Sequence, residues 1–158
     1  MRRLFLFLIA LGWLACGGSA RDALGDARGA LAEARYDDAI VAAETGLSGQ
    51  PDEVTAWGLE LVRLEAMARG GRGDDAVALI ARLAEERPQQ IGASQYSASA
   101  GQLQAADQGV AAIQMLDLGL QRFPDDPALK DLIEQAKAAP EAGSDELEML
   151  RSLGYLAD

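Results

Sequence analysis

The chain has 158 residues and a formal net charge of −11 at pH 7, because 25 acidic residues outnumber 14 lysines and arginines. So acidic a chain offers no surface suited to the phosphate backbone of a nucleic acid. It has no histidine and a single cysteine, which excludes Ser-His-Asp and Cys-His catalysis and zinc sites built on those ligands. We therefore expect a protein that is not an enzyme and that needs no cofactor and no metal.

Residues 1–15 have the pattern of an export signal. Arg2 and Arg3 precede an apolar run from Leu4 to Ala15, and about a dozen apolar residues are too few to span a bilayer. The following Cys16 cannot form an intrachain disulfide, because the chain has no second cysteine. We expect this signal to be removed from the mature protein.

The run Leu14-Ala15-Cys16-Gly17 resembles the processing site of bacterial lipoproteins. The resemblance implies that Cys16 is lipidated and becomes the first mature residue, with residues 16–20 as a short tether to the membrane. Gly17 is not the aspartate that holds some lipoproteins at the inner membrane, so the resemblance favours the outer membrane, facing the periplasm. The alternative is an ordinary secretory signal with a chance cysteine near its end.

Three later segments share one pattern. Each has an alanine, an apolar or small residue four positions on, a pair of such residues at seven and eight, and a proline at twelve. The segments begin at Ala39, Ala76 and Ala112 and end at Pro51, Pro88 and Pro124, so that successive prolines lie 37 and 36 residues apart. Such a period is typical of stacked helical hairpins.

Each of these helices is preceded by a segment with residues at helical spacing. The three sets are Ala23, Ala27 and Ala30, then Trp57, Leu61 and Leu64, then Tyr96, Ala100 and Leu103. Together with the alanine-to-proline segments they resemble the tetratricopeptide repeat. The resemblance implies an all-α fold, a right-handed α-solenoid of about three hairpins over residues 21–138, closed by a C-terminal capping helix.

The first unit covers Arg21 to Pro51 and the second Val54 to Pro88. We expect the adjacent acids Asp37-Asp38 and Asp74-Asp75 to satisfy helix N-termini. Three residues in excess of the repeat precede Ala76, and the glycines of residues 69–73 predict a longer turn there. Trp57 is interpreted as a core residue, the alternative being an exposed anchor for a ligand.

The third unit covers Ile91 to Pro124, and its first helix is rich in serine and glutamine. That composition indicates either a weak helix or a hydrogen-bonding wall of a groove. A further helix should begin at Pro127 and present one apolar stripe to the stack, formed by Leu129, Leu132, Ile133 and Ala136.

Residues 139–144 have the composition of a linker, and residues 145–158 predict a short helical tail. Asp145 with Glu148 suggests a capping pair at its start, and Gly154 its end. The tail resembles the Leu-x-x-Leu-Gly-Tyr endings of some exported sulfatase-like and repeat proteins. It is either a second cap folded onto the last hairpin or a docking peptide anchored by Leu150, Leu153 and Tyr155.

The family resemblance also implies a concave protein-binding surface on the first helices of the hairpins. The expected partner-binding positions on it are Leu24, Arg28, Leu31, Thr55, Val62, Glu65, Ser94, Ser97 and Gln104. A mixed apolar and polar lining suits a protein segment. The resulting hypothesis is an adaptor that holds a protein partner of the cell envelope and binds the membrane through Cys16. The alternatives are an assembly factor for pilus secretins or outer-membrane proteins, and a structural accessory subunit of a large envelope complex.

Overall fold

The computed structural model describes residues 20–138 and 143–157, in which the chain forms eight α-helices and no strand. The all-α prediction is thereby confirmed. The expectations about the export signal, Cys16 and most of the linker lie outside the described residues. The helices are α1 (Ala20–Ala32), α2 (Tyr36–Ser48), α3 (Glu53–Arg69), α4 (Gly73–Glu86), α5 (Ala93–Ala105), α6 (Gly109–Arg122), α7 (Pro127–Ala138) and α8 (Asp145–Ser152).

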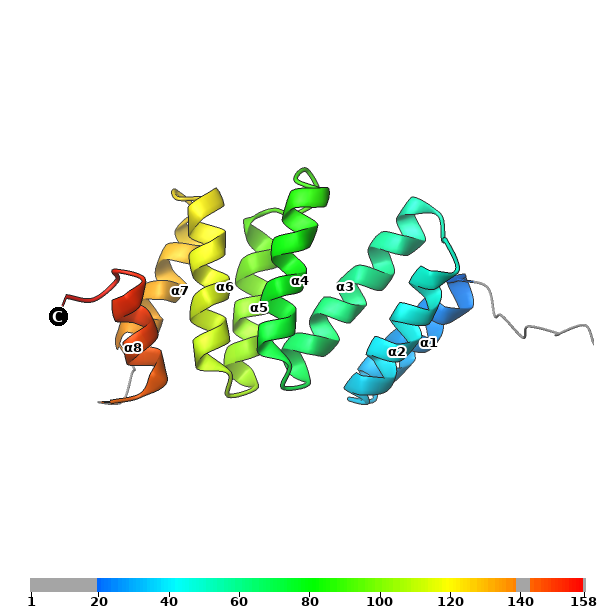
Figure 1. The fold of residues 1–158 in the computed structure, drawn as a ribbon, viewed down its shortest axis with the longest axis horizontal. Coiled ribbons are helices and arrows are strands. Elements are labelled where there is room, and N and C mark those ends of the chain that lie inside the picture. The colour runs from blue at the N-terminus through cyan, green and yellow to red at the C-terminus, as the bar shows by residue number, and fades with distance from the viewer. Residues whose placement is uncertain (1–19, 139–142, 158) are drawn as a thin grey trace, which may run out of the picture.

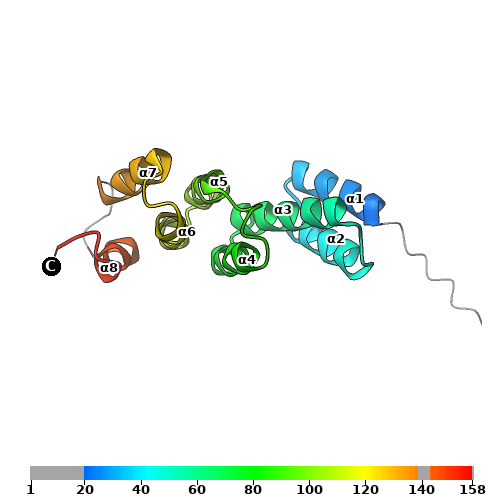
Figure 2. The ribbon, with the colours of Figure 1, turned by 90° about the horizontal axis from the view of Figure 1, so that it is seen from above.

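The helices follow one another along a single long axis, from α1 and α2 at one end to α7 and α8 at the other (Figure 1). Consecutive helices pack as the hairpins α1–α2, α3–α4 and α5–α6. Contacts between hairpins connect α3 with both α1 and α2, α3 with α5 and α5 with α7, and likewise α4 with α6 and α6 with α8. Odd-numbered and even-numbered helices therefore lie toward opposite sides of the molecule (Figure 2).

A residue in the left-handed backbone conformation recurs in the turn before each even-numbered helix. Ala34, Gly71, Asp107 and Gly143 have φ angles of 57°, 82°, 57° and 84°, and they are spaced 37, 36 and 36 residues apart. After each of the first three, the next residue's amide donates to a carbonyl five residues back, as Gln108 does to Leu103 at 2.9 Å. The backbone thus repeats the period of the prolines, and repeats it once more before α8.

Because of this register, α8 lies where the second helix of a fourth hairpin would lie. The even-numbered helices begin at Tyr36, Gly73, Gly109 and Asp145. Of the two alternatives for residues 145–158, a cap folded onto the last hairpin or a docking peptide, the contacts favour the cap. Helix α8 continues the even-numbered layer by packing against α6.

The turn geometry also corrects the register expected for α3. Counting back from Gly71 as from Asp107, the residues equivalent to Tyr96 and Ala100 are Glu60 and Leu64, not Trp57 and Leu61. The three extra residues do not lengthen the turn, which spans 70–72 just as the others span 33–35 and 106–108. They lengthen α3, which has 17 residues where α1 and α5 have 13.

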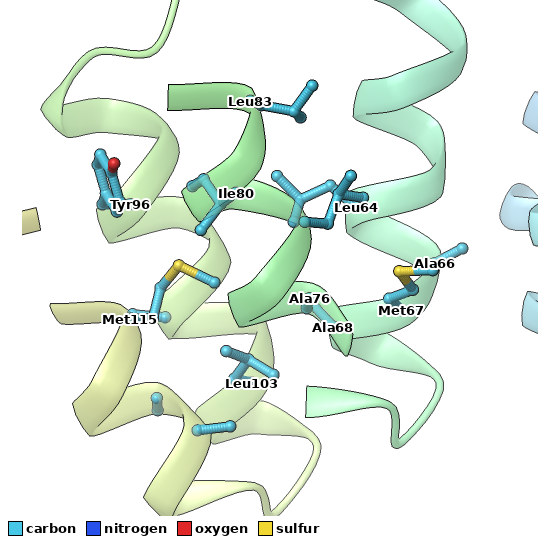
Figure 3. Close-up of a cluster of buried hydrophobic side chains, with 14 of the residues drawn as sticks. Leu64, Ala66, Met67, Ala68, Ala76, Ile80, Leu83, Tyr96, Leu103 and Met115 are labelled. Carbon is cyan, nitrogen blue, oxygen red and sulfur yellow. The ribbon is translucent and has the colours of Figure 1, made fainter. Parts of the chain in front are cut away.

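The core lies between the two layers, and Figure 3 shows its part formed by α3 to α6. Tyr96, Leu103 and Met115 are at most 1% exposed there, in the same buried cluster as the repeat residues Ala76, Ile80 and Leu83 of α4 (Figure 3). Two glycines of the second helices allow close approaches within this core. A Cβ on Gly46 would lie 2.9 Å from the Cβ of Ala23, and one on Gly119 would lie 2.9 Å from the Cβ of Tyr96.

Asp38 and Asp75 do not provide the helix caps that the sequence predicted. The residues that precede α2 and α4, Arg35 and Arg72, provide no side-chain cap. Each of these arginines instead forms an ion pair with the aspartate three residues on, Arg35 with Asp38 and Arg72 with Asp75. The aspartates still place negative charge in the first turn, where the helix dipole favours it. Asp38 and Asp75 therefore act through ion pairs and not through the predicted caps.

Candidate protein-binding surface

Part of the predicted surface forms where α1 crosses α3. Leu24 and Arg28 lie over Gly58, since a Cβ on this glycine would be 3.1 Å from Leu24 Cδ2 and 3.6 Å from Arg28 Nη2. Leu61 occupies the repeat position of Leu24 on α3 and is half-buried. Gly58 and Leu61 were not among the surface residues predicted from the sequence, although counting back from the glycine of the α3–α4 turn places both of them here.

Three expected surface residues are buried instead. Leu31 and Val62 are 9% and 7% exposed and belong to the core between the layers. Thr55 is 5% exposed, and its backbone amide and hydroxyl donate to the two carboxylate oxygens of Asp52 at 3.0 and 2.8 Å. These two bonds lower the pKa of Asp52. Thr55 thus completes the N-terminal cap of α3, and all three side chains have little surface left for a partner.

The remaining expected residues lie at the surface in polar surroundings. Glu65 forms an ion pair with Arg69 at 3.0 Å, and the Arg69 guanidinium lies 5.4 Å from the centre of the Tyr36 ring. On α5, Ser94 and Gln104 are exposed and Ser97 is half-buried, its hydroxyl donating to the carbonyl of Ser94 at 3.2 Å. The odd-numbered face is therefore apolar and basic near Leu24 and Arg28, and uncharged and polar along α5.

Trp57 is neither a fully buried core residue nor an exposed anchor, the two alternatives that the sequence left open. It is half-buried and packs against the edge of the core. The guanidinium carbon of Arg87, in the loop after α4, lies 5.8 Å from its ring centre. Such a cation–π contact joins the start of the second hairpin to its end.

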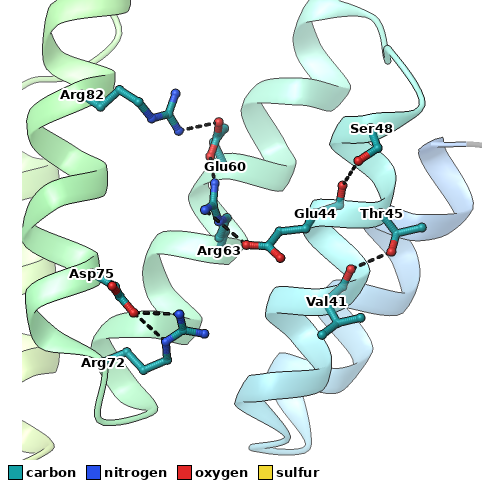
Figure 4. A network of polar contacts seen from close by, with 9 residues as sticks. All are labelled: Val41, Glu44, Thr45, Ser48, Glu60, Arg63, Arg72, Asp75 and Arg82. Atoms are coloured by element: carbon teal, nitrogen blue, oxygen red, sulfur yellow. Dashed lines mark hydrogen bonds and ion pairs between the residues drawn. The ribbon is translucent and has the colours of Figure 1, made fainter.

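A chain of ion pairs crosses three helices on the opposite side of α3 (Figure 4). Glu60 binds Arg82 of α4 at 2.9 Å and Arg63 at 3.5 Å, and Arg63 reaches Glu44 of α2 at 3.2 Å. Glu60 is 8% exposed, and its bond raises the pKa of Arg82. A glutamate is thus accommodated at a repeat position that α5 fills with Tyr96.

We expect Glu60→Ala to lower the free energy of unfolding by about 1–3 kcal/mol, because both arginines lose a shared, nearly buried acceptor. The cost stays below that of a fully buried pair, since the side chains of Arg63 and Arg82 are 24% and 40% exposed and gain water. Glu65→Ala is the control, because its exposed pair with Arg69 contributes at most about 0.5 kcal/mol. Equal urea midpoints for the two variants would show that the chain of ion pairs is not stabilising.

The outer face of the first hairpin is hollow and charged. An open notch of about 400 Å³ is lined by Gly25, Asp26, Gly29, Ala30, Glu33, Arg35, Asp38 and Ala42. Asp38 and Ala42 hold the repeat positions at which α6 presents Ala111 and Met115 to α4. The first hairpin thus has an aspartate where α6 has Ala111 and a smaller alanine where α6 has Met115, which makes this face more polar.

At the other end, the three residues expected in the tail pack on the protein's own surface. Leu150 is fully buried, while Leu153 and Tyr155 are half-buried against the core. The Tyr155 hydroxyl donates to Asp117 Oδ1 of α6 at 2.9 Å. The N-terminal cap of α8 is Ser144, whose hydroxyl accepts from the amide of Leu147 at 3.3 Å, and not the expected Asp145. The arrangement is that of a cap.

The Tyr155 phenol is expected to ionise late. Burial, together with the bond to Asp117, raises its pKa from 10.0 to about 12. The folded state therefore favours the neutral phenol, so this contribution to stability is complete below pH 10 and is lost as the pH rises toward 12. Tyrosinate absorbance should show a component near pH 12 that Tyr155→Phe removes and Tyr36→Phe keeps. Loss of that component in the Tyr36 variant instead would contradict the assignment.

In the described residues no group of three or more histidine, cysteine, aspartate or glutamate side chains is placed to hold a metal ion. Nor does the search of the same residues find a helix long and apolar enough to cross a membrane. Comparisons with protein-family models, with curated proteins and with solved structures found no match.

Proposed function

We propose that this chain is a right-handed α-solenoid of tetratricopeptide-like hairpins that works as a protein-binding adaptor. The observation that carries the proposal is the recurrence of one hairpin at a period of 36 to 37 residues in the turns, the helix starts and the prolines. Hairpins stacked in this way create an extended surface from neighbouring first helices, and such surfaces bind protein segments.

The proposed contact surface is the free side of α1, α3 and α5. Its members are Leu24, Arg28, Gly58, Leu61, Glu65, Ser94, Ser97 and Gln104, which are exposed or half-buried. Leu24 and Leu61 offer apolar anchors, Arg28 offers a cation, and the hydroxyl and amide groups of α5 offer hydrogen bonds. This combination fits an extended or helical protein segment with an acidic residue near its apolar anchors.

The adaptor is proposed to be a lipoprotein of the bacterial envelope, held through Cys16. This part rests on the sequence of residues 1–17. Several acyl chains would anchor the chain stably, whereas one would bind a membrane only marginally. A fatty-acid probe supplied to cells should label the unaltered chain and not the Cys16→Ser variant, and equal labelling of the two would contradict the lipid anchor.

Photo-crosslinking in cells tests the binding surface. Photoreactive residues at Arg28, Glu65 and Ser97 should capture one discrete protein, while the same residue at Val41 or Glu85 should not. Val41 is 62% exposed and Glu85 is also exposed, and both lie on even-numbered helices. Equal capture from both sides, or no capture from the odd-numbered helices, would overturn the proposal. Among the alternatives, a subunit clamped into a complex through Leu150 and Tyr155 is disfavoured, because both side chains already pack within the chain.

A further inference from the structure

Helix α8 packs on a surface of α6, called here the seat of α8, and contacts are made at both ends of this surface. A Cβ on Gly109, the first residue of α6, would lie 2.6 Å from Glu146 Oε1 and 2.8 Å from Glu146 Cγ. Two turns later Asp117 accepts the hydroxyl of Tyr155 at 2.9 Å. The start of α8 contacts the start of α6, and Tyr155, just after α8, contacts α6 two turns further on, so the two helices run parallel. Helix α8 therefore lies along the line of Gly109, Ile113 and Asp117, which are four residues apart.

The same docking geometry joins α6 to α4. A Cβ on Gly73, the first residue of α4, would lie 2.6 Å from the Cβ of Ala111. Near the other end, Arg122 donates to the carbonyl of Ala84 at 2.9 Å. Helices α4 and α6 therefore each present a seat for a parallel helix, opened at the first residue by a glycine. The seat on α6 thus repeats the one on α4.

Helix α8 is held on α6 by far fewer buried residues than hold α6 in the core. Six residues of α6 are buried, whereas α8 buries Leu150. Helix α6 also packs against α4, α5 and α7, while the main contact of α8 among the described helices is with α6. Elements with few buried apolar contacts open at the lowest local free energy. Helix α8 can therefore leave without disturbing the core between α3 and α6.

We infer that α8 is an exchangeable cap, and that the α6 surface beneath it is a docking site which the α8 helix of a second copy of this chain can occupy. The site matches this helix in three places: Leu150 enters the core, Tyr155 bonds to Asp117, and Glu146 lies against Gly109. End-to-end stacking of a second copy is less favourable, because the notch of the first hairpin is lined by four charged residues and by no apolar side chain larger than alanine. The inference goes beyond the proposed function and does not depend on the odd-numbered face binding anything.

A labelled peptide of residues 143–157 tests the site when it is added to the full chain. Leu150→Asp in the chain removes the intramolecular anchor, so fluorescence anisotropy should show saturable binding of the peptide to this variant. Binding to the unaltered chain should be at least tenfold weaker, because its own α8 competes at a high effective concentration. A peptide carrying Leu150→Asp should fail to bind either chain, and Asp117→Ala in the chain should weaken binding severalfold. Circular dichroism shows whether the other helices remain folded.

Two results would overturn the inference. One is the absence of binding to a folded Leu150→Asp chain at millimolar peptide, and the other is equal binding to that chain and the unaltered one. If Leu150→Asp does not fold, hydrogen exchange in the unaltered chain decides. Amides of α8 should then exchange at least tenfold faster than those of α6, and equal protection of both helices would show that α8 does not open by itself.

Discussion

Replacing Leu59 by alanine is expected to lower the free energy of unfolding by about 3–4 kcal/mol, the range of large-to-small changes in a tightly packed core. Leu59 is 0% exposed, and its two methyl carbons lie 2.9 and 3.1 Å from where a Cβ on Gly46 would stand. It therefore fills the gap between α2 and α3. Urea unfolding followed by circular dichroism measures the loss. Leu61→Ala, at a half-buried position, should cost about 1 kcal/mol.

The cavity left by Leu59→Ala should be partly refilled by a second change. Gly46→Ala alone is expected to cost about 1–2 kcal/mol, because the new methyl would press on both Leu59 and Ala23. In the double variant the methyl group moves into the space that Leu59 leaves, so the loss should be smaller than the sum by about 1 kcal/mol. Strict additivity would mean that α2 and α3 do not meet at these two residues.

Gly119→Leu is expected to cost about 2–3 kcal/mol through overpacking. A Cβ at this position would lie 2.9 Å from the Cβ of Tyr96 and 3.0 Å from Leu129 Cδ1, and neither α5 nor α7 can retreat without breaking its own contacts. Gly101→Leu on α5 is the matched control. A Cβ there meets nothing within 4 Å, so the change should be neutral or stabilise the helix by up to about 1 kcal/mol. The measurement is the urea midpoint of each variant.

The repeat alone would suggest that a leucine is tolerated in place of Gly119, because the equivalent residue of α4 is Leu83, which is fully buried. We attribute the difference to the facing helix. Where α5 places Tyr96 opposite Gly119, α3 places Glu60 in the equivalent position, and the carboxylate turns toward Arg63 and Arg82. A Gly119→Leu variant as stable as the unaltered chain would show that the α5–α6 contact adapts freely.

The second helices of the hairpins were predictable because their small and apolar residues recur at fixed offsets. Ala39, Ala43 and Gly46 are buried as expected, and so are their counterparts in α4 and α6. The local signal suffices here, since a helix packed on both of its neighbours needs small residues on a defined stripe. The start of α7 at Pro127 was predictable for a similar reason, the fixed φ of proline at a first turn.

The register of α3 was not predictable from the same kind of pattern. The spacing of Trp57, Leu61 and Leu64 imitates that of Tyr96, Ala100 and Leu103, whereas the turn at Gly71 places Glu60 and Leu64 in register with Tyr96 and Ala100. A glutamate can be buried at this aromatic position only when cations from α3 and α4 form ion pairs with its carboxylate. The sequence does not show that these groups lie close together. The same error assigned Thr55 and Val62 to the surface.

The sequence by itself determined the helical class, the period of the hairpins, the absence of histidine chemistry and the polar first turns, because each depends on residues close together in the chain. The tertiary structure decided which face of α3 is buried, that two arginines share Glu60, and that α8 packs on α6 as a cap. The reason is physical: contacts between hairpins join residues about 36 to 40 positions apart, such as Gln108 with Ala68 and Tyr155 with Asp117, and local periodicity carries no information about which of several apolar stripes will face such a neighbour.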